Sequence, residues 1–358
     1  MFRNYFAIPT WLAVMLVGTI LLTVTVLAVL GFFTAGAVLA AARQPFNPLE
    51  TAAEQVAGTA LPPLAQEGIV PLATLPPNMP TPTPIPTSSA INDGRTNILI
   101  MGIDRRPGEP FISRTDTMML ASINPLDNSI SLLSIPRDLY VVIPGHGRDR
   151  INTAFVYGSG SNNPAGGAAL AMQTIEYNLG VPVDHYLMVD FNAFIQTIDS
   201  LGGIDVYVPY DINDPTFPDM NYGYDPLYIP AGLQHLDGYT ALKYARTRHQ
   251  DNDFYRAERQ QQLLLALRDK ALGLGFTELL RQAPGMYARL SDGIRTDLSL
   301  EELLQLANIA KDVPDGNVRN EVLGYDYVVS YTTEAGAAVL VLINEQAAPL
   351  IAELFLDN

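Results

Sequence analysis

The sequence predicts an α/β protein with a three-layer α/β/α arrangement around a central mixed sheet, preceded by one transmembrane helix and a Pro-rich linker. Three observations predict this fold class. Short, continuous apolar runs end at glycine or at turn residues, which is typical of strands buried on both faces. Segments of helical periodicity alternate with these runs. Two neighbouring runs are joined by a short turn, so the sheet contains an antiparallel pair and is mixed.

The chain begins with a predicted membrane anchor, residues 1–43. No charged residue occurs from Asn4 to Ala42. A helix needs about 20 apolar residues to cross ~30 Å of hydrocarbon, so this run is long enough. A cleaved signal peptide is the alternative, and Ala-Gly-Ala at Ala35 to Ala37 favours it. Its apolar region, however, is only about 7–15 residues long. The sequence therefore favours an uncleaved, single-pass helix in the cell membrane, although the flanking charges do not set its orientation.

Residues 44–95 are predicted to form an extended linker. Residues 75–89 contain six prolines, several of them alternating with threonine. Proline has no N–H to donate to a sheet and favours the polyproline II conformation. This segment is therefore predicted to be a semi-rigid stalk, and a Pro-rich ligand for a partner protein is the alternative.

The remaining residues, 96–358, are predicted to form one globular domain. Its first strand is the apolar run Asn97–Met101, which ends at Gly102. Thr117–Ile123 and Ile130–Ile135 are two more such runs, separated by turn residues, and they predict a hairpin beside the first strand.

Further elements follow along the chain, each bounded by glycine, proline or an N-cap residue. Strands are expected at His185–Val189 and Ile204–Val208, and a loop at Asp211–Leu227. Helices are expected at Gly167–Leu179, Phe191–Leu201, Asp237–Tyr244, Asp253–Leu272, Thr277–Gln282 and Leu300–Lys311.

Composition excludes several classes of function. The chain has no cysteine, so it cannot form a disulfide, a cysteine-ligated zinc site or a thiol nucleophile. Its net charge of −16 opposes binding to nucleic acid. The same acidity makes any local cluster of arginines informative, because the composition does not predict one.

The first chemical cluster lies around the hairpin. Asp104 follows the first strand, and Asp116, preceded by Arg114, begins the next; ligands of open α/β sheets usually bind at such strand ends. Two neighbouring carboxylates repel each other unless a cation lies between them, and Mg²⁺ takes one or two carboxylates. Arg137 ends another apolar run and is expected at the same sheet edge. A surface network of Asp/Arg ion pairs is the alternative interpretation.

The second cluster precedes and opens a predicted helix. Arg246 and Arg248 stand at alternate positions, so in an extended segment both point one way. Asp253 is expected to cap the following helix. One face of that helix is cationic in its first turns and apolar beyond them. The polar residues of that face are Arg256, Arg259 and Gln260, and its apolar residues are Leu263, Leu264 and Leu267.

This gradient suits a ligand with a phosphate head and an apolar tail. Arginine forks bind phosphate oxygens bidentately, and the helix N-terminus adds a favourable dipole. The alternative is an amphipathic core helix whose arginines pair with neighbouring carboxylates.

Several motifs together resemble the LytR-CpsA-Psr family, in order and at similar spacing. The resemblance covers residues 96–272 closely and the remainder loosely. Arg150 stands where the family commonly has lysine, and Leu139 where many members have threonine. The motifs are Asn97–Asp104, Arg114–Met119, Ser134–Asp138, Ile151–Asn152, Asp190–Phe191, Leu201–Ile204, Ala245–His249 and Arg256–Gln260.

The resemblance implies an extracytoplasmic, Mg²⁺-dependent phosphotransferase. Its donor would be a glycopolymer on a polyprenyl-pyrophosphate carrier, and its acceptor peptidoglycan. By motif position, Asp104 and Asp116 resemble the metal-side carboxylates. The residues that resemble the pyrophosphate ligands are Arg114, Arg137, Arg246, Arg248, Arg256 and Gln260. Two other functions stay open at this point: a polyprenyl-pyrophosphate pyrophosphatase, and a non-catalytic lipid-phosphate-binding regulator of the envelope.

Overall fold

A computed structural model describes residues 94–356 of the protein, apart from 106–108, 220–222 and 249–251. The predicted anchor, residues 1–43, and nearly all of the predicted linker lie outside the described residues. Within the described part of the chain, no helix is both long enough and apolar enough to span a bilayer.

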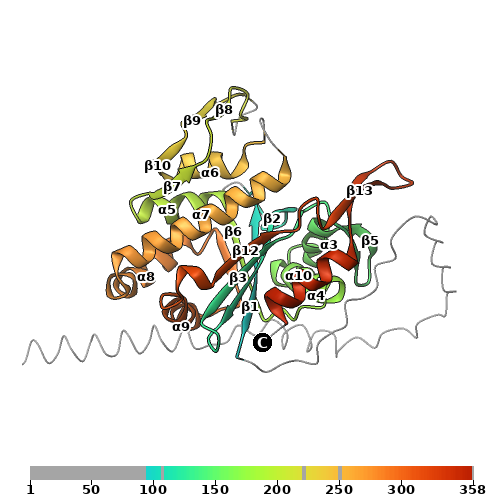
Figure 1. Cartoon of the computed structure of the whole chain (residues 1–358), viewed down its shortest axis with the longest axis horizontal. Coiled ribbons are helices and arrows are strands. Elements are labelled where there is room, and N and C mark those ends of the chain that lie inside the picture. The colour runs from blue at the N-terminus through green and yellow to red at the C-terminus, as the bar shows by residue number, and fades with distance from the viewer. Residues whose placement is uncertain (1–93, 106–108, 220–222, 249–251, 357–358) are drawn as a thin grey trace, which may run out of the picture. The chain divides into compact units, whose positions relative to one another are not determined.

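A six-stranded mixed sheet forms the centre of the fold (Figure 1). β1 pairs with β6 and β3 pairs with β12 in parallel, whereas the other neighbours are antiparallel. The predicted hairpin and the mixed sheet are therefore confirmed. In spatial order the strands are β11 (Ile294–Thr296), β6 (His185–Asp190), β1 (Thr96–Ile103), β2 (Thr115–Asn124), β3 (Ser129–Ser134) and β12 (Val318–Val322).

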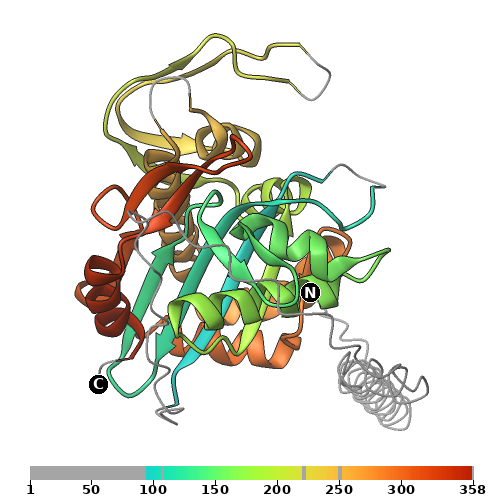
Figure 2. The same ribbon diagram turned by 90° about the vertical axis from the view of Figure 1, so that its right-hand side faces the viewer.

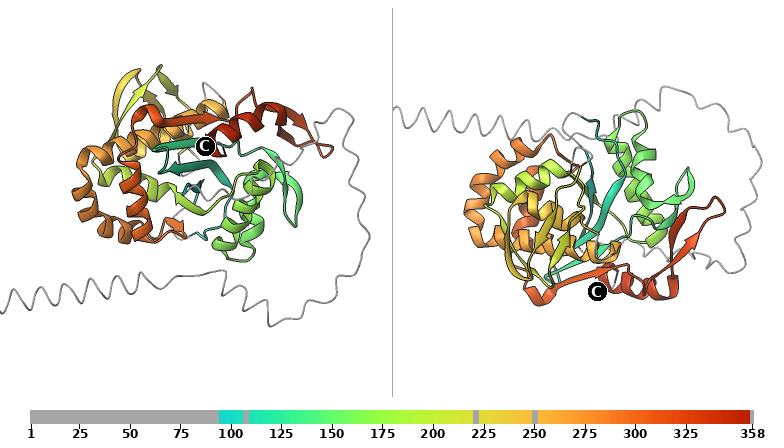
Figure 3. Two further views of the ribbon diagram at one scale, coloured as in Figure 1. Left: turned by 60° about the horizontal axis from the view of Figure 1, so that its bottom comes forward. Right: turned by 90° about the horizontal axis from the view of Figure 1, so that it is seen from above.

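Helices cover both faces of this sheet (Figure 3). One face carries α3 (Ala154–Ser159), α4 (Pro164–Leu179) and α10 (Asn344–Phe355). The opposite side carries α5 (Phe191–Ser200), α6 (Gly238–Arg246), α7 (Asp253–Leu274), α8 (Phe276–Leu290) and α9 (Leu300–Ala310). Two short 3₁₀ helices span Ile151–Thr153 and Asp315–Asn317.

Strand pleating explains the continuous apolar runs. Side chains alternate between the two faces of a strand, and both faces here are covered. Leu99, Met101 and Ile103 of β1 pack into the main core beneath α4 and α10. Ile100 faces the other side, towards α7. Residues 98–103 of β1 are therefore all apolar or glycine.

Four two-stranded sheets complete the described chain. The segment predicted as a loop at Asp211–Leu227 contains one of these strands and touches another, so that prediction is wrong in part. Three-residue strands are too short to show alternation, which is why the pattern missed them. The pairs are β4 (Tyr140–Ile143) with β5 (Gly147–Arg150), β7 (Ile204–Val208) with β10 (Gly232–Leu236), β8 (Ile212–Asp214) with β9 (Leu227–Ile229), and β13 (Val328–Thr332) with β14 (Ala338–Leu342). The β8–β9 hairpin projects beyond the helices at the top of Figures 1 and 2.

Candidate active site

A cavity of about 710 Å³ lies between the sheet and helices α5, α6 and α7. Most of its sheet wall is formed by residues at alternate positions of three adjacent strands, as pleating requires. These residues are Ile100 and Gly102 of β1, Thr117 and Met119 of β2, and Leu187 and Val189 of β6. The strands thus contribute an apolar wall that the helices do not fill.

Helix α7 contributes the facing wall. Leu263, Leu264 and Leu267, the leucines singled out from the sequence, all line the cavity. Leu263 is 2% exposed and also packs into the core around β7 and α6, whereas the other two are half-buried. Gln260 and Arg256 line the same cavity about one and two turns earlier in the helix, respectively. The gradient from polar to apolar along one helix face is therefore present in the fold.

The polar end of the cavity gathers residues from four elements. Asp104 follows β1, and Asp116 lies in β2, so both carboxylates reach the lining. Arg246 ends α6, and its Nη2 lies 3.8 Å from an Asp104 carboxylate oxygen. Burial lowers the pKa of Arg246, while Asp104 and Asp116 act in the opposite direction. The guanidinium therefore has a desolvated environment in which a further anion is favoured.

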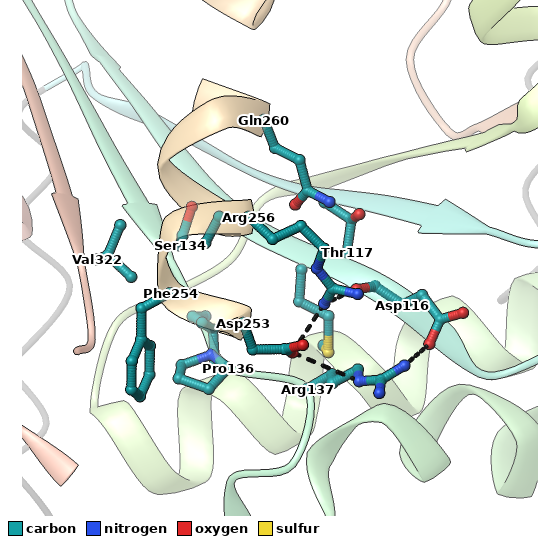
Figure 4. A pocket seen from close by; sticks show the side chains of 13 residues that line it. Asp116, Thr117, Ser134, Pro136, Arg137, Asp253, Phe254, Arg256, Gln260 and Val322 are labelled. Carbon is teal, nitrogen blue, oxygen red and sulfur yellow. Dashed lines mark hydrogen bonds and ion pairs between the residues drawn. The ribbon is translucent and has the colours of Figure 1, made fainter. Parts of the chain in front are cut away.

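A network of ion pairs joins Asp116 to the start of α7 (Figure 4). Arg137 Nη1 lies 2.5 Å from Asp116 Oδ1, and its Nε lies 3.5 Å from Asp253 Oδ2. Arg256 donates from Nη2 to Asp253 at 2.9 Å and to the Asp116 carbonyl at 3.1 Å. Arg248 reaches the other Asp253 oxygen at 3.1 Å. Asp253 thus holds three arginines around the mouth of the cavity.

Burial affects the charges of this network differently. It disfavours the charge of Arg137, but the hydrogen bond and charge of Asp116, together with two further carboxylates, prevail and raise the pKa of Arg137. Burial lowers the pKa of Arg256 to about 10, which still leaves it charged at neutral pH. Arg256 Nε is buried and has no hydrogen-bond acceptor among the described residues. A buried, unsatisfied donor costs about 1–3 kcal/mol, and of the four arginines whose Nε is in this state among the described residues only Arg256 lines the cavity.

Two local predictions need correction. Arg246 and Arg248 do not share an extended segment: Arg246 is the last residue of α6, and Thr247 is its extended C-cap. Asn252 caps α7 in place of Asp253, because its side chain accepts from the amides of Phe254 and Tyr255. That cap leaves the carboxylate of Asp253 available to the arginines.

Three arginines singled out from the sequence, Arg114, Arg137 and Arg259, do not line the cavity. Arg137 lies beside it, paired with Asp116 of the lining. Arg259 is 5% exposed and donates to the carbonyls of Tyr244 and Thr247. It therefore fixes the end of α6, the segment that carries Arg246 and Arg248. Arg114 is exposed and precedes β2 without forming part of the lining. The spacing along α7 could not separate the inward Arg259 from the cavity-facing Arg256, because both lie on one helix face.

Other lining residues carried no role in the sequence interpretation. Asp190 ends β6 and caps α5, and Phe191 begins that helix. The guanidinium of Arg246 lies 4.5 Å from the Phe191 ring centroid and 5.5 Å from that of Phe217. The pair Asp190-Phe191 formed part of the family resemblance, and that was the signal that could have found it.

Two carboxylates of the cavity, Asp104 and Asp116, could hold a metal ion. Among the described residues, no group of three or more His, Cys, Asp or Glu side chains is placed to hold an ion. Asp104 and Asp116 line one cavity, and their side chains are 43% and 35% exposed. Such a pair fits Mg²⁺, which completes its octahedron with water and phosphate oxygens.

Comparison with known proteins identifies the family. The model of the LytR_cpsA_psr family matches residues 79–350. The chain therefore belongs to the LytR-CpsA-Psr family, as the motifs indicated. The α/β fold with its central mixed sheet is the fold of solved members, including TagT bound to LIIa-WTA (TM-score 0.57, 28% identity, 73% of this chain and 89% of that chain). The crystal structure of Bacillus subtilis TagV gives a TM-score of 0.57 at 26% identity, over 73% of this chain and 96% of that one.

Curated relatives carry names of transferases. The chain is 36% identical over 212 residues to the polyisoprenyl-teichoic acid–peptidoglycan teichoic acid transferase TagU of Oceanobacillus iheyensis, which covers 59% of this chain and 61% of that protein. It is 34% identical over 215 residues to TagU of Enterococcus faecalis, over 59% of this chain and 64% of that protein. The match therefore spans less than two thirds of the length of these relatives.

Proposed function

We propose that this protein transfers a glycopolymer from a polyprenyl-pyrophosphate carrier onto peptidoglycan in a Mg²⁺-dependent reaction. One observation carries the proposal: a single cavity joins an apolar interior to a mouth that holds Arg246, Arg248 and Arg256 beside Asp104 and Asp116. A polyprenyl pyrophosphate likewise has an apolar chain at one end and a charged head at the other. The names of the relatives support a peptidoglycan acceptor and a polymer of the teichoic acid type.

The apolar part of the cavity would take the prenyl chain. Its walls come from β1, β2 and β6 on one side and from the leucines of α7 on the other. A close-packed core leaves few voids larger than a water molecule, whereas this space is of the size of a ligand site. Burial of the chain there would contribute roughly 0.8 kcal/mol for each CH₂ group.

The arginines would hold the pyrophosphate. Arg256 has a buried Nε with no acceptor among the described residues. The guanidinium of Arg246 lies 3.8 Å from a carboxylate oxygen of Asp104 and packs against the rings of Phe191 and Phe217. Charge-assisted contacts to phosphate are roughly twice as strong as neutral hydrogen bonds. They also offset the negative charge that gathers on the leaving phosphate.

Asp104 and Asp116 would hold the Mg²⁺ ion. When bound, the ion would neutralise charge on the pyrophosphate oxygens. Arg137, at 2.5 Å from Asp116, keeps that carboxylate at the mouth of the cavity.

The transfer itself needs one bond to form and one to break. An acceptor hydroxyl attacks the phosphorus that bears the glycopolymer, and the bond from that phosphorus to the bridging oxygen breaks. Polyprenyl monophosphate leaves, and the polymer is joined to the acceptor through a phosphodiester. The hydroxyl proton passes to a carboxylate oxygen that does not contact the ion. Asp104 is the better placed of the two residues for this, because its arginine partner is 3.8 Å away, against 2.5 Å for Asp116.

The reaction places the domain outside the cytoplasm, on the side of the membrane where peptidoglycan lies. We propose that residues 1–43 anchor it there as a single-pass helix and that residues 44–95 act as the stalk. The membrane then presents the lipid carrier to the cavity.

Incubation of the full-length protein in detergent with a defined lipid-pyrophosphate glycan and peptidoglycan fragments tests the proposal. Mass spectrometry should show a glycan joined to peptidoglycan through a phosphodiester, together with polyprenyl monophosphate. Release of phosphate products without any need for an acceptor would identify a pyrophosphatase instead. Tight binding of the lipid with no product in the presence of Mg²⁺ would identify a non-catalytic binder.

A further inference from the structure

A buried ion pair lies directly behind the mouth of the cavity. Arg105 Nη1 is 2.6 Å from Asp190 Oδ2, and the two side chains are 6% and 2% exposed. Arg105 also donates to the carbonyls of Glu109 at 2.8 Å and Asp292 at 3.1 Å. Its guanidinium lies 4.6 Å from the ring centroid of Phe111. The residue next to Asp104 is thereby fixed at several points.

Asp190 also makes contacts with residues other than Arg105. Its second oxygen accepts from the amide of Ala193 at 2.8 Å and so caps α5. Its own amide donates to the carbonyl of Gly293 at 2.9 Å. A Cβ atom at Gly293 would lie 2.5 Å from the Asp190 carboxylate, so this close approach requires glycine. Asp190 is thus held by contacts from the segment after β1, from α5 and from the turn before β11.

The neighbouring residues Asp104 and Arg105 lie close to the neighbouring residues Asp190 and Phe191, beside the guanidinium of Arg246. The parallel register of β1 and β6 sets Ile103 opposite Asp190, which brings the ends of both strands together. Asp104 then faces Arg246 at 3.8 Å, and the ring of Phe191, next to Asp190, lies under the same guanidinium at 4.5 Å. Arg105 and Asp190 therefore connect the backbones that carry two of the partners of Arg246, Asp104 and Phe191.

We propose that Arg105 and Asp190 are positioning residues that orient Asp104 and Arg246 for the reaction. This inference rests on the proposed function and names the residues that set the geometry of its site. A buried ion pair is weak evidence for stability, because desolvation of both charges offsets their attraction. We assign the ion pair a role in orientation, because it fixes the segment that follows β1 and carries Asp104. Replacement of residues that orient metal ligands in this way commonly lowers metal affinity or activity about 10- to 100-fold.

A double-mutant cycle on the full-length protein tests the proposal. Arg105→Met is combined with Asp104→Asn, and Asp190→Asn serves as a second variant because its amide oxygen still caps α5. Arg295→Met is the matched control. The Arg295 guanidinium lies 4.4 Å from the same Phe111 ring, but it donates to the backbone carbonyls of Ser291, Asp292 and Ile294. The readouts are the turnover number for transfer, the affinity for Mn²⁺ measured by electron paramagnetic resonance, and the melting temperature.

Arg105→Met and Asp190→Asn should each lower the turnover number and the Mn²⁺ affinity about tenfold, and neither should have a further effect once Asp104 is replaced. Arg295→Met should leave both quantities within about twofold of the unaltered protein. Equal losses in both backgrounds, or a lower melting temperature without loss of either readout, would show a purely structural role and overturn the inference. Absence of both transfer and Mn²⁺ binding in the unaltered protein would overturn the proposed function and this inference with it.

Discussion

Replacement of Leu264 by tryptophan tests whether the cavity receives a lipid. Leu264 is half-buried on the wall formed by α7, and the space beside it measures about 710 Å³. The larger side chain can therefore enter the cavity instead of displacing packed neighbours. A prenyl unit has five carbons and is close in size to a leucine side chain, whose full burial is worth about 1.5–3 kcal/mol. Exclusion of one unit should weaken binding of a polyprenyl pyrophosphate about 10- to 150-fold.

Leu133→Trp is the matched control for this change. Leu133 is fully buried in the core on the other face of the sheet, where its packed neighbours leave no space for an indole ring. Overpacking there should lower the free energy of unfolding by about 1–3 kcal/mol. Leu264→Trp should have little such effect, as measured by denaturant unfolding, while lipid binding is measured by isothermal titration calorimetry in detergent. Destabilisation of both variants to the same degree, with lipid affinity unchanged for Leu264→Trp, would refute the assignment of the cavity.

Three further outcomes are expected from the same site and from one titrating pair. Arg256→Ala should weaken binding of the lipid pyrophosphate by about 10- to 100-fold in the same titration, and Arg256→Lys should not restore it fully, because lysine lacks the guanidinium fork; normal binding by both would make this arginine structural. Asp116→Ala should abolish Mg²⁺-dependent transfer while circular dichroism shows an unchanged fold, and full activity in EDTA would eliminate the metal site. The hydrogen bond that His185 Nδ1 donates to Asp297 raises the pKa of His185 above its ordinary 6.5. The pair therefore stabilises the fold fully below pH 6.5 and loses this effect as the pH rises through the higher folded-state pKa. Asp297→Asn should flatten that decline in the free energy of unfolding, and an unchanged pH profile would show that the pair contributes nothing.

Local sequence chemistry predicted most of the elements that build the site. The apolar runs before Asp104 and after Asp116 became β1 and β2, and the turn between β2 and β3 formed where its residues indicated. The face of α7 that carries Arg256 and the leucines was also predicted, because spacing along a helix fixes which side chains share a face.

Other features could not be predicted from local patterns. Short strands such as β8 and β9 have three residues each, too few to show a period. The Asn252 cap and the Asp253 ion pairs involve adjacent residues with similar capping ability, so the sequence alone did not separate their roles. Which of two neighbours caps the helix depended on where the arginines of other elements came to lie.

The sequence by itself determined the strand ends, the helix faces and the kinds of residue that meet at the mouth of the cavity. These depend on interactions over a few residues, such as periodicity, glycine stops and caps. Only the tertiary structure decided that Arg259 turns inward to the end of α6 while Arg256 faces the cavity, and that Arg105 meets Asp190, 85 residues later. These pairings depend on strand register and on the packing of helices against the sheet, which join distant segments of the chain and leave no local pattern in it.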